Sequence, residues 1–385
     1  MRVFLLAGEP SGDRLGGALM AGLRHLQPEI AFDGIGGPMM QTQGLASRFP
    51  MDELSVMGVA EVLPKYFHLK RRIAETARAV IDTRPDVLIT IDSPDFSLRV
   101  AKQVKAETDI RTVHYVAPTV WAWRPKRAAK MAKMIDHVLA LFPFEPPYME
   151  AEGMECDFVG HPVVAEPQAT DAEVSAFRRA HGLGDAPILL VLPGSRKGEV
   201  SRLTPVFGPA LTTFLKNRPE MRVVVPAAGP VADMVRNAAS GWPGQPLIID
   251  PTSHEGKAAE IEKRAAFRAA DLALAASGTV SLELAAAQTP MVIAYKVQWL
   301  TWQIVKNMFL VDTANLVNLV SDTRVVPECI SENCTPERIV TALEAQIAAP
   351  DAQAVAMELT MERLGRGGDN PGLRAAHAVL RGLGV

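Results

Sequence analysis

Short apolar runs alternate with longer helical patterns along the first half of the chain. Each run ends in small or polar residues, as expected of a buried strand; the predicted strands are Val3–Ala7, Ala31–Ile35, Asp86–Ile91, Arg111–Val116 and Val138–Leu141. After the first run, leucines recur at helical spacing from Leu15 to Leu26. Continuous apolar strands separated by helices predict a parallel sheet with helices on both faces.

The same alternation restarts near Pro187, after a predicted helix at Asp171–His181. The predicted strands of this second array are Ile188–Leu192, Arg222–Pro226, Pro246–Ile249, Leu272–Ala276 and Met291–Tyr295. A last helix is expected over Asp369–Leu383. With 385 residues, the chain is long enough for two domains. We place them at residues 1–165 and 166–365, and we expect the helix at about 366–385 to return to the first.

Composition narrows the functional classes. Apolar residues make up 48% of the chain, charged residues 22%, and the net charge is −3, which disfavours a general nucleic-acid binder. Three cysteines without CxxC spacing indicate reduced thiols in a cytosolic protein, and no apolar run is long enough to span a bilayer. No metal-ligand spacing of His or Cys is present, so no metal site is predicted.

The segment from Asp271 to Lys296 predicts a strand, a helix over Val280–Ala287 and a second strand. Ser277, Gly278 and Thr279 join the first strand to the helix, where unpaired backbone N–H groups favour a phosphate. Glu283, about one turn further on, is placed to accept hydrogen bonds from a ribose. The alternative is an ordinary crossover with a serine cap.

Two other strand ends carry small residues before a helix. Gly8–Asp13 has neither the P-loop nor the GxGxxG pattern but permits close backbone approach to a ligand, here through Glu9, Ser11 and Gly12. Its alternative is a tight turn capped by Ser11 or Asp13.

In the second array, Gly194–Glu199 places Ser195 and Arg196 at a strand end. The Arg196 guanidinium suits bidentate phosphate contact. The alternative for this loop is a solvated basic turn.

Polar residues also follow two strands of the first array. Asp92 is the first polar residue after a buried strand and is a candidate general base, whereas Asp95 is expected to cap the next helix, Phe96–Val104. Trp121 and Arg124 follow the neighbouring strand and predict a wall that contacts sugar or phosphate. A core tryptophan with a basic helix face is the alternative.

Two segments have the composition of a membrane-surface patch or lipid-chain groove. Leu54–Phe67 is apolar and aromatic and runs into the basic stretch His68–Arg72. The segment from Trp299 to Leu310 is rich in tryptophan and apolar residues near two lysines. For each, an amphipathic core helix is the alternative.

Taken together, the motifs resemble the lipid-A-disaccharide synthase family over nearly the whole chain. The motifs, in order, are AGEPSGD, VMGVAEVLP, IDSPDF, HYVAPTVWAWRPKR, FPFE, FVGHP, LPGSRKGEV, ASGTVSLELA and PMVIAYK. The chain departs from the family where serines usually flank a proline, here Ala117 and Thr119. It also has Val317-Asn318 in place of Pro-Asn, which leaves the Asn for a nucleotide-sugar contact.

The resemblance implies a GT-B architecture, in which two Rossmann-like domains face each other across a cleft. It implies an inverting transfer of 2,3-diacylglucosamine from UDP-2,3-diacylglucosamine to 2,3-diacylglucosamine 1-phosphate, without a metal or other cofactor. In that reaction Asp92 removes the acceptor proton and Arg196 with Ser277–Thr279 stabilises the leaving UDP. Glu283 and Asn318 hold the donor.

The resemblance further places the acceptor on the first domain and UDP-sugar on the second. It implies a cytoplasmic protein held peripherally at the inner face of the inner membrane, with a homodimer as a possible assembly. The alternatives are another GT-B sugar-nucleotide enzyme (a peptidoglycan glucosaminyltransferase or an epimerase) or a nucleotide- or lipid-binding protein without catalysis. A nicotinamide dehydrogenase is disfavoured because no GxGxxG follows the first strand.

Overall fold

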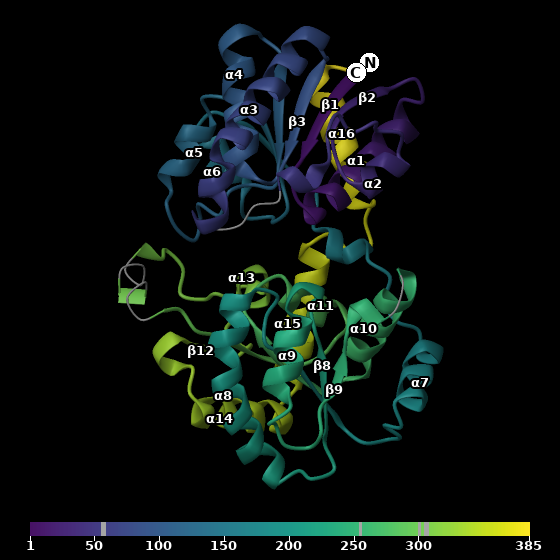
Figure 1. Ribbon diagram of the computed structural model, residues 1–385, viewed down its shortest axis with the longest axis vertical. Helices are drawn as coiled ribbons and strands as arrows, with labels where there is room; N and C mark the ends of the chain where they lie inside the picture. The colour runs from purple at the N-terminus through teal and green to yellow at the C-terminus, as the bar shows by residue number, and fades with distance from the viewer. Residues whose placement is uncertain (55–58, 254–255, 299–301, 304–307) are drawn as a thin grey trace. The chain divides into compact units, whose positions relative to one another are not determined.

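A computed structural model describes the chain except for residues 55–58, 254–255, 299–301 and 304–307, and except for the side chains of residues 59–65 and 253. The described residues form two compact units (Figure 1). The first comprises Met1–Ala165 and Leu364–Val385, and the second comprises Glu166–Arg363. Each unit is built around its own parallel sheet.

The sheet of the first unit has the strand order β2-β1-β3-β4-β5-β6. Its strands are β1 (Arg2–Ala7), β2 (Ala31–Ile35), β3 (Val87–Ile91), β4 (Arg111–Tyr115), β5 (His137–Ala140) and β6 (Glu155–Phe158). All neighbouring pairs are parallel. The central strands are buried along their length because helices cover both faces.

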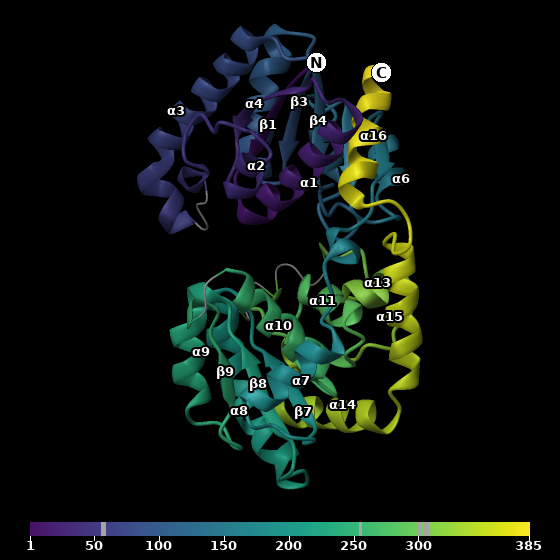
Figure 2. The same ribbon diagram turned by 90° about the vertical axis from the view of Figure 1, so that its right-hand side faces the viewer.

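Helices alternate with these strands. They are α1 (Pro10–Leu26), α2 (Pro38–Thr42), α3 (Val59–Thr83), α4 (Pro94–Glu107), α5 (Lys126–Met131) and α6 (Pro146–Glu150). The C-terminal helix α16 (Pro371–Leu383) lies beside α1, as both views show (Figure 2). Gly22 and Gly372 allow this close approach, since a Cβ on Gly372 would lie 2.5 Å from the Ala18 carbonyl oxygen.

The sheet of the second unit has the order β12-β11-β10-β7-β8-β9, again parallel throughout. Its strands are β7 (Ile188–Leu192), β8 (Arg222–Pro226), β9 (Leu247–Ile249), β10 (Leu272–Ala276), β11 (Met291–Tyr295) and β12 (Glu328–Ile330). Its helices are α7 (Asp171–Ala180), α8 (Lys197–Lys216), α9 (Ala232–Ala239), α10 (Lys257–Ala269), α11 (Val280–Ala286), α13 (Leu316–Ser321), α14 (Pro336–Ala348) and α15 (Asp351–Arg363).

The apolar periodicity predicted ten of these strands to within one residue at each end. Two further strands, β6 and β12, were not predicted. Both are edge strands, short and only partly buried, so their sequences lack a continuous apolar run.

None of the helices within the described ranges combines the length and the apolar character needed to cross a membrane.

Candidate active site

The strand order of the second unit creates a switch point between β7 and β10. From β7 the chain continues to β8 on one side of the sheet, and from β10 it continues to β11 on the other side. The loops that leave the carboxyl ends of β7 and β10 therefore diverge. Ligands of open parallel sheets bind in such a crevice. A cavity of about 590 Å³ lies there, lined by both loops and by the ends of β8 and β9.

The β7–α8 loop supplies one wall of the cavity through Gly194, Ser195 and Arg196. Gly194 has a φ of 114°, which favours glycine, and a Cβ there would come within 2.6 Å of the Glu199 side chain. The Glu199 carboxylate accepts hydrogen bonds from the N–H groups of Ser195 (3.1 Å) and Arg196 (3.3 Å). Glu199 therefore orders the loop ahead of any ligand.

The Arg196 guanidinium is largely exposed, with 68% of the side chain accessible. Its contact with Glu199 is long, at 3.9 Å between Nη1 and Oε1. Because an exposed pair at this distance contributes little, the guanidinium is available to an anion in the cavity.

The β10–α11 loop supplies the opposite wall through Ser277, Gly278 and Thr279. Gly278 has a φ of 154° and open space where a Cβ would lie. The Ser277 hydroxyl donates to the Ala314 carbonyl at 3.0 Å, which fixes that end of the loop. Helix α11 has only seven residues, so the backbone N–H groups of its first turn matter more here than its macrodipole.

Glu283 also lines the cavity, and it is paired with a lysine that the sequence did not indicate. Lys263 Nζ lies 2.5 Å from Glu283 Oε2 and 5.2 Å from the centre of the Phe267 ring. Both partners are part of the lining. The ion pair holds the Glu283 carboxylate in the cavity rather than leaving it to rotate in solvent.

The remaining lining was not predicted. It is mostly apolar, and much of it comes from the carboxyl ends of β8 and β9 and from helix α10: Pro226, Ala227, Ala228, Ile249, Pro251, Ala259 and Phe267. The signal that could have found it is positional, because all carboxyl ends of a parallel sheet meet at one edge.

Asn318 does not belong to the lining. It is 1% exposed, and its side chain bonds both backbone groups of Val326, accepting from the N–H and donating to the carbonyl at 2.9 Å each. Its amide is thus committed to holding α13 against the segment that leads into β12. Asn318 therefore lies in the scaffold beside the cavity loops, and its expected contact with a nucleotide sugar stays a prediction.

The first unit has its own switch point between β1 and β3, whose ends pair at Ala7 and Ile91. Gly8 follows β1, and a Cβ on it would lie 2.8 Å from Ser93 Oγ. The predicted loops Gly8–Asp13 and Asp92–Asp95 are therefore adjacent.

Asp92 is half-buried at this switch point, in a left-handed conformation with a φ of 51°. Its N–H donates to the Tyr115 carbonyl at 3.0 Å, and its own carbonyl accepts from Ser97 Oγ at 2.9 Å. Its carboxylate has no hydrogen-bond partner among the residues described. A non-glycine backbone held in this region is strained, and such strain is concentrated at functional sites.

Asp95 does not cap the following helix. Helix α4 begins at Pro94, its N-cap is Ser93 in a left-handed conformation, and no side chain makes the cap hydrogen bond. Asp95 lies inside the first turn, where its charge still suits the helix dipole.

The Gly8–Asp13 segment also differs from expectation. Helix α1 begins at Pro10 with Glu9 as N-cap, so Ser11 and Gly12 lie in its first turn. Neither Ser11 nor Asp13 caps this helix. Asp13 is 3% exposed and accepts hydrogen bonds from backbone N–H groups at the start of α2.

Trp121 belongs to the core rather than to a substrate-contacting wall. It is 9% exposed, its indole N–H donates to Glu145 Oε1 at 3.2 Å, and its ring packs edge-on against Phe144. Arg124 is exposed, as expected, and its guanidinium lies 4.2 Å from the centre of the Trp123 ring. Trp123, which is half-buried, is therefore the more accessible tryptophan of this loop.

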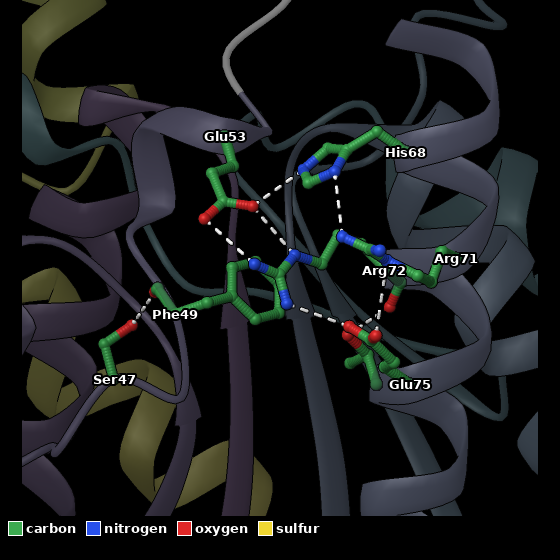
Figure 3. A network of polar contacts seen from close by, with 8 residues as sticks. Ser47, Phe49, Glu53, His68, Arg71, Arg72 and Glu75 are labelled. Carbon is green, nitrogen blue, oxygen red and sulfur yellow. Dashed lines mark hydrogen bonds and ion pairs between the residues drawn. The ribbon is translucent and has the colours of Figure 1, made fainter.

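Two residues of the predicted basic stretch His68–Arg72 form polar contacts within the fold (Figure 3). Arg72 forms a two-bond pair with Glu53 (2.7 and 3.0 Å), and its guanidinium lies 4.4 Å from the centre of the Phe49 ring. His68 Nε2 lies 2.7 Å from the same carboxylate. The Arg72 guanidinium, hydrogen-bonded to Glu53, holds the pKa of that carboxyl below its usual range.

Much of the two predicted membrane-surface segments lies outside the described residues, including 55–58, 299–301 and 304–307. In the parts that are described, large apolar side chains are exposed. They are Tyr66 (46%), Phe67 (81%), Met308 (40%), Phe309 (44%) and Leu310 (60%).

In the part of the chain that the structure covers, no group of three or more His, Cys, Asp or Glu side chains is placed to hold a metal ion.

Solved structures with the same two-unit architecture define the fold class. UDP-GlcNAc 2-epimerase from Neisseria meningitidis, solved with UDP-GlcNAc bound, has a TM-score of 0.64 at 12% identity, covering 100% of this chain and 99% of its own. A putative UDP-N-acetylglucosamine 2-epimerase from Listeria monocytogenes has a TM-score of 0.62 at 13% identity, covering 98% and 94%. The chain has the GT-B fold, with two Rossmann-like α/β domains.

Comparison with related sequences identifies the protein family, which the fold alone does not. The family model for lipid-A-disaccharide synthetase matches residues 3–371. Lipid-A-disaccharide synthase from Ruegeria pomeroyi is 70% identical over 99% of this chain and 95% of its own length. The enzyme of that name from Rhodospirillum centenum is 45% identical over 98% and 94%. The chain belongs to the lipid-A-disaccharide synthase family and is a glycosyltransferase.

Proposed function

We propose that the chain transfers a 2,3-diacylglucosaminyl group from UDP-2,3-diacylglucosamine to the 6-hydroxyl of 2,3-diacylglucosamine 1-phosphate. The new bond joins the acceptor oxygen to the anomeric carbon of the donor, and the bond from that carbon to UDP breaks. The acceptor proton passes to a carboxylate. The products are the β-1,6-linked disaccharide 1-phosphate and UDP.

The cavity at the β7–β10 switch point carries this proposal. Its walls combine an exposed guanidinium from Arg196, the small-residue loop Ser277–Thr279 and the Glu283 carboxylate around a volume of about 590 Å³. The Arg196 side chain and the backbone N–H groups at the start of α11 suit the diphosphate, whose negative charge grows as the bond breaks. Glu283, held by Lys263, suits the ribose hydroxyls.

On the acceptor side, Asp92 is the proposed general base. Its half-buried carboxylate stands at the β1–β3 switch point without a hydrogen-bond partner among the described residues, which leaves it able to accept a hydroxyl proton. Glu9, Ser11 and Gly12 begin the adjacent helix α1 and are proposed to border the acceptor sugar. Arg124 is proposed to contact its 1-phosphate.

The first experiment measures UDP release from donor with and without acceptor. Acceptor-dependent release together with a disaccharide phosphate product supports the synthase. Release without acceptor indicates an epimerase- or hydrolase-like enzyme, and saturable donor binding without release indicates a binding protein.

The base is tested with Asp92→Asn, and Asp95→Asn serves as the matched control because it neutralises the neighbouring carboxylate at the same helix start. We expect Asp92→Asn to lower kcat by about 10²-fold or more, with UDP affinity unchanged. Turnover within a few-fold of the control removes Asp92 from the base role.

We also propose that the protein associates peripherally with a membrane at the cytoplasmic face. The exposed apolar side chains beside basic residues support this, since Phe67 is 81% exposed and Lys70 and Arg71 follow it. Co-sedimentation with vesicles of phosphatidylethanolamine and phosphatidylglycerol should decrease for Phe67→Glu. It should not decrease for Val355→Glu, which alters another strongly exposed apolar residue (70%) on α15. Equal sedimentation of both variants contradicts the role of Phe67.

A further inference from the structure

Glu145 is a buried carboxylate that the proposed reaction does not use. It stands at the start of α6 and is 2% exposed. Burial raises the pKa of Glu145 to about 7, although three N–H donors favour its charged form. Burying a carboxylate destabilises the fold unless hydrogen bonds to its oxygens compensate for the lost hydration.

The three donors come from two separate segments. Oε2 accepts from the backbone N–H groups of Leu141 and Phe142, each at 3.0 Å, directly after β5. Oε1 accepts from the indole N–H of Trp121 at 3.2 Å. Glu145 thus links the end of β5 to the loop that follows β4.

That loop is held in a strained backbone conformation. Val116 at its start has a φ of 88°, and Arg124 near its end has a φ of 52°. A β-branched residue at positive φ persists only when its surroundings determine the conformation. Between the two strained residues, Trp121 is anchored by Glu145 and by edge-on packing against Phe144, with ring centres 5.2 Å apart.

The same loop presents cations to solvent. Arg124 of the loop and Arg127 of the following helix α5 lie 4.2 Å and 5.3 Å from the centre of the Trp123 ring, and both are exposed. The indole N–H of Trp123 donates to Thr119 at 3.2 Å. One tryptophan therefore anchors the loop inside the fold, and its near neighbour supports the two guanidinium groups outside.

We propose that Glu145 is a positioning residue for the acceptor: through Trp121 it fixes the loop that carries Arg124, so that this guanidinium meets the phosphate monoester. The proposal rests on the acceptor role given to Arg124 under the proposed function. It adds a buried residue, remote from the reacting atoms, that sets affinity for one of the two substrates.

Glu145→Gln tests the link selectively. The glutamine oxygen still accepts from the N–H groups of Leu141 and Phe142, but its NH₂ group then faces the indole N–H, so the bond to Trp121 is lost. Trp121→Phe removes the donor from the other side and keeps an aromatic ring. Glu150→Gln, an exposed carboxylate on the same short helix, is the matched control.

Kinetics are measured at pH 8, where Glu145 is ionised, with acceptor and donor varied separately and UDP affinity measured by calorimetry. We expect Glu145→Gln and Trp121→Phe each to raise the KM for acceptor about three- to tenfold, with kcat and UDP affinity within twofold of the parent. Glu150→Gln should change none of these. Combined with Arg124→Ala, Glu145→Gln should add no further increase in KM, because it acts through that guanidinium.

Three results would overturn the proposal, and they separate it from the proposed function. If Arg124→Ala raises the acceptor KM but Glu145→Gln and Trp121→Phe do not, Arg124 acts without this support and the reaction assignment stands. If Arg124→Ala itself has no effect, the phosphate contact fails, and the positioning role fails with it. If the two variants lower UDP affinity and thermal stability together, Glu145 serves the core alone.

Discussion

Asp13 offers the sharpest test of the packing in the first unit. Its Oδ1 accepts from the N–H groups of Gly37 (2.9 Å) and Met40 (3.0 Å), and its Oδ2 accepts from Met39 at 2.9 Å. These donors belong to the unpaired first turn of α2. A carboxylate on α1 therefore provides the N-terminal cap of a different helix.

The loss of stability expected when the Asp13 carboxylate is replaced follows from the N–H donors that it accepts from. In Asp13→Asn one oxygen becomes an NH₂ group, so the N–H of Met39 loses its acceptor beside a side chain that is only 3% exposed. That loss costs about 2 kcal/mol, and the two remaining bonds lose their charge assistance at ~0.5–1 kcal/mol each. We expect a destabilisation of about 3–4 kcal/mol for Asp13→Asn and about 5 kcal/mol or more for Asp13→Ala, a large part of a domain's stability.

Hydrogen exchange followed by mass spectrometry measures the protection of the α2 backbone amides in a peptide that spans residues 37–42. Urea unfolding gives the free energy of unfolding of each variant. Asp109→Asn, an exposed change in the same unit, is the control. Unchanged exchange in that peptide, with a urea midpoint equal to the control's, would refute the capping role of Asp13.

Three further predictions test the cavity, the contact between α1 and α16, and the buried His161. Arg196→Ala should weaken UDP binding about tenfold or more, while Lys197→Ala, the adjacent exposed cation outside the cavity lining, should not; equal Kd values would exclude Arg196. Gly372→Ala should lower the Tm and cost about 1–3 kcal/mol, because its Cβ meets the Ala18 carbonyl at 2.5 Å; an unchanged melting curve would contradict that contact. Burial lowers the pKa of His161 to about 4, so its contribution to stability is present above pH 6.5 and is lost as the pH falls toward 4, by about 3 kcal/mol in all. His161→Asn should remove that part of the pH dependence in urea unfolding, and an identical slope would argue against a buried neutral imidazole.

The strands were predictable from the sequence because each central strand is buried on both faces. Such a strand must be a short run of apolar residues, which is why Ile188–Leu192 and Leu272–Ala276 were predicted with both ends correct. The edge strand β6 has the sequence ECDF and is only partly buried, so no apolar run marked it. Its pairing with β5 depends on tertiary context that periodicity does not carry.

Loop positions were predictable for a related reason, but the partners of individual side chains were not. A loop that follows a buried strand must emerge at the carboxyl edge of the sheet, which placed Ser195, Arg196, Ser277 and Glu283 around one cavity. Asp13, by contrast, bonds to residues that lie 24 to 27 positions further along the chain. Local pattern offers no signal for contacts of that separation.

Trp121 and Asn318 also show that the partners of individual side chains were not predictable from the sequence. Each stands in a motif that suggested ligand contact, and each side chain is satisfied within the fold, Trp121 by Glu145 and Asn318 by Val326. A side chain with its hydrogen bonds already made contributes to a site by shaping it. Residues that touch the ligand should instead be exposed and unpaired, as the Arg196 guanidinium nearly is.

In both sheets the candidate site lies at the point where the strand order reverses, although the two strand orders differ. In the second unit the order reverses between β7 and β10, and in the first it reverses between β1 and β3. At each reversal the two outgoing loops diverge to opposite faces, and ligands of open parallel sheets bind at such points. Small residues follow β7, β10 and β1 at these positions, and Asp92 and Ser93 after β3 both take positive φ. Strand order therefore determines where each site lies, and the loop residues determine its chemistry: cationic and rich in backbone N–H groups at the second switch point, carboxylate-bearing at the first.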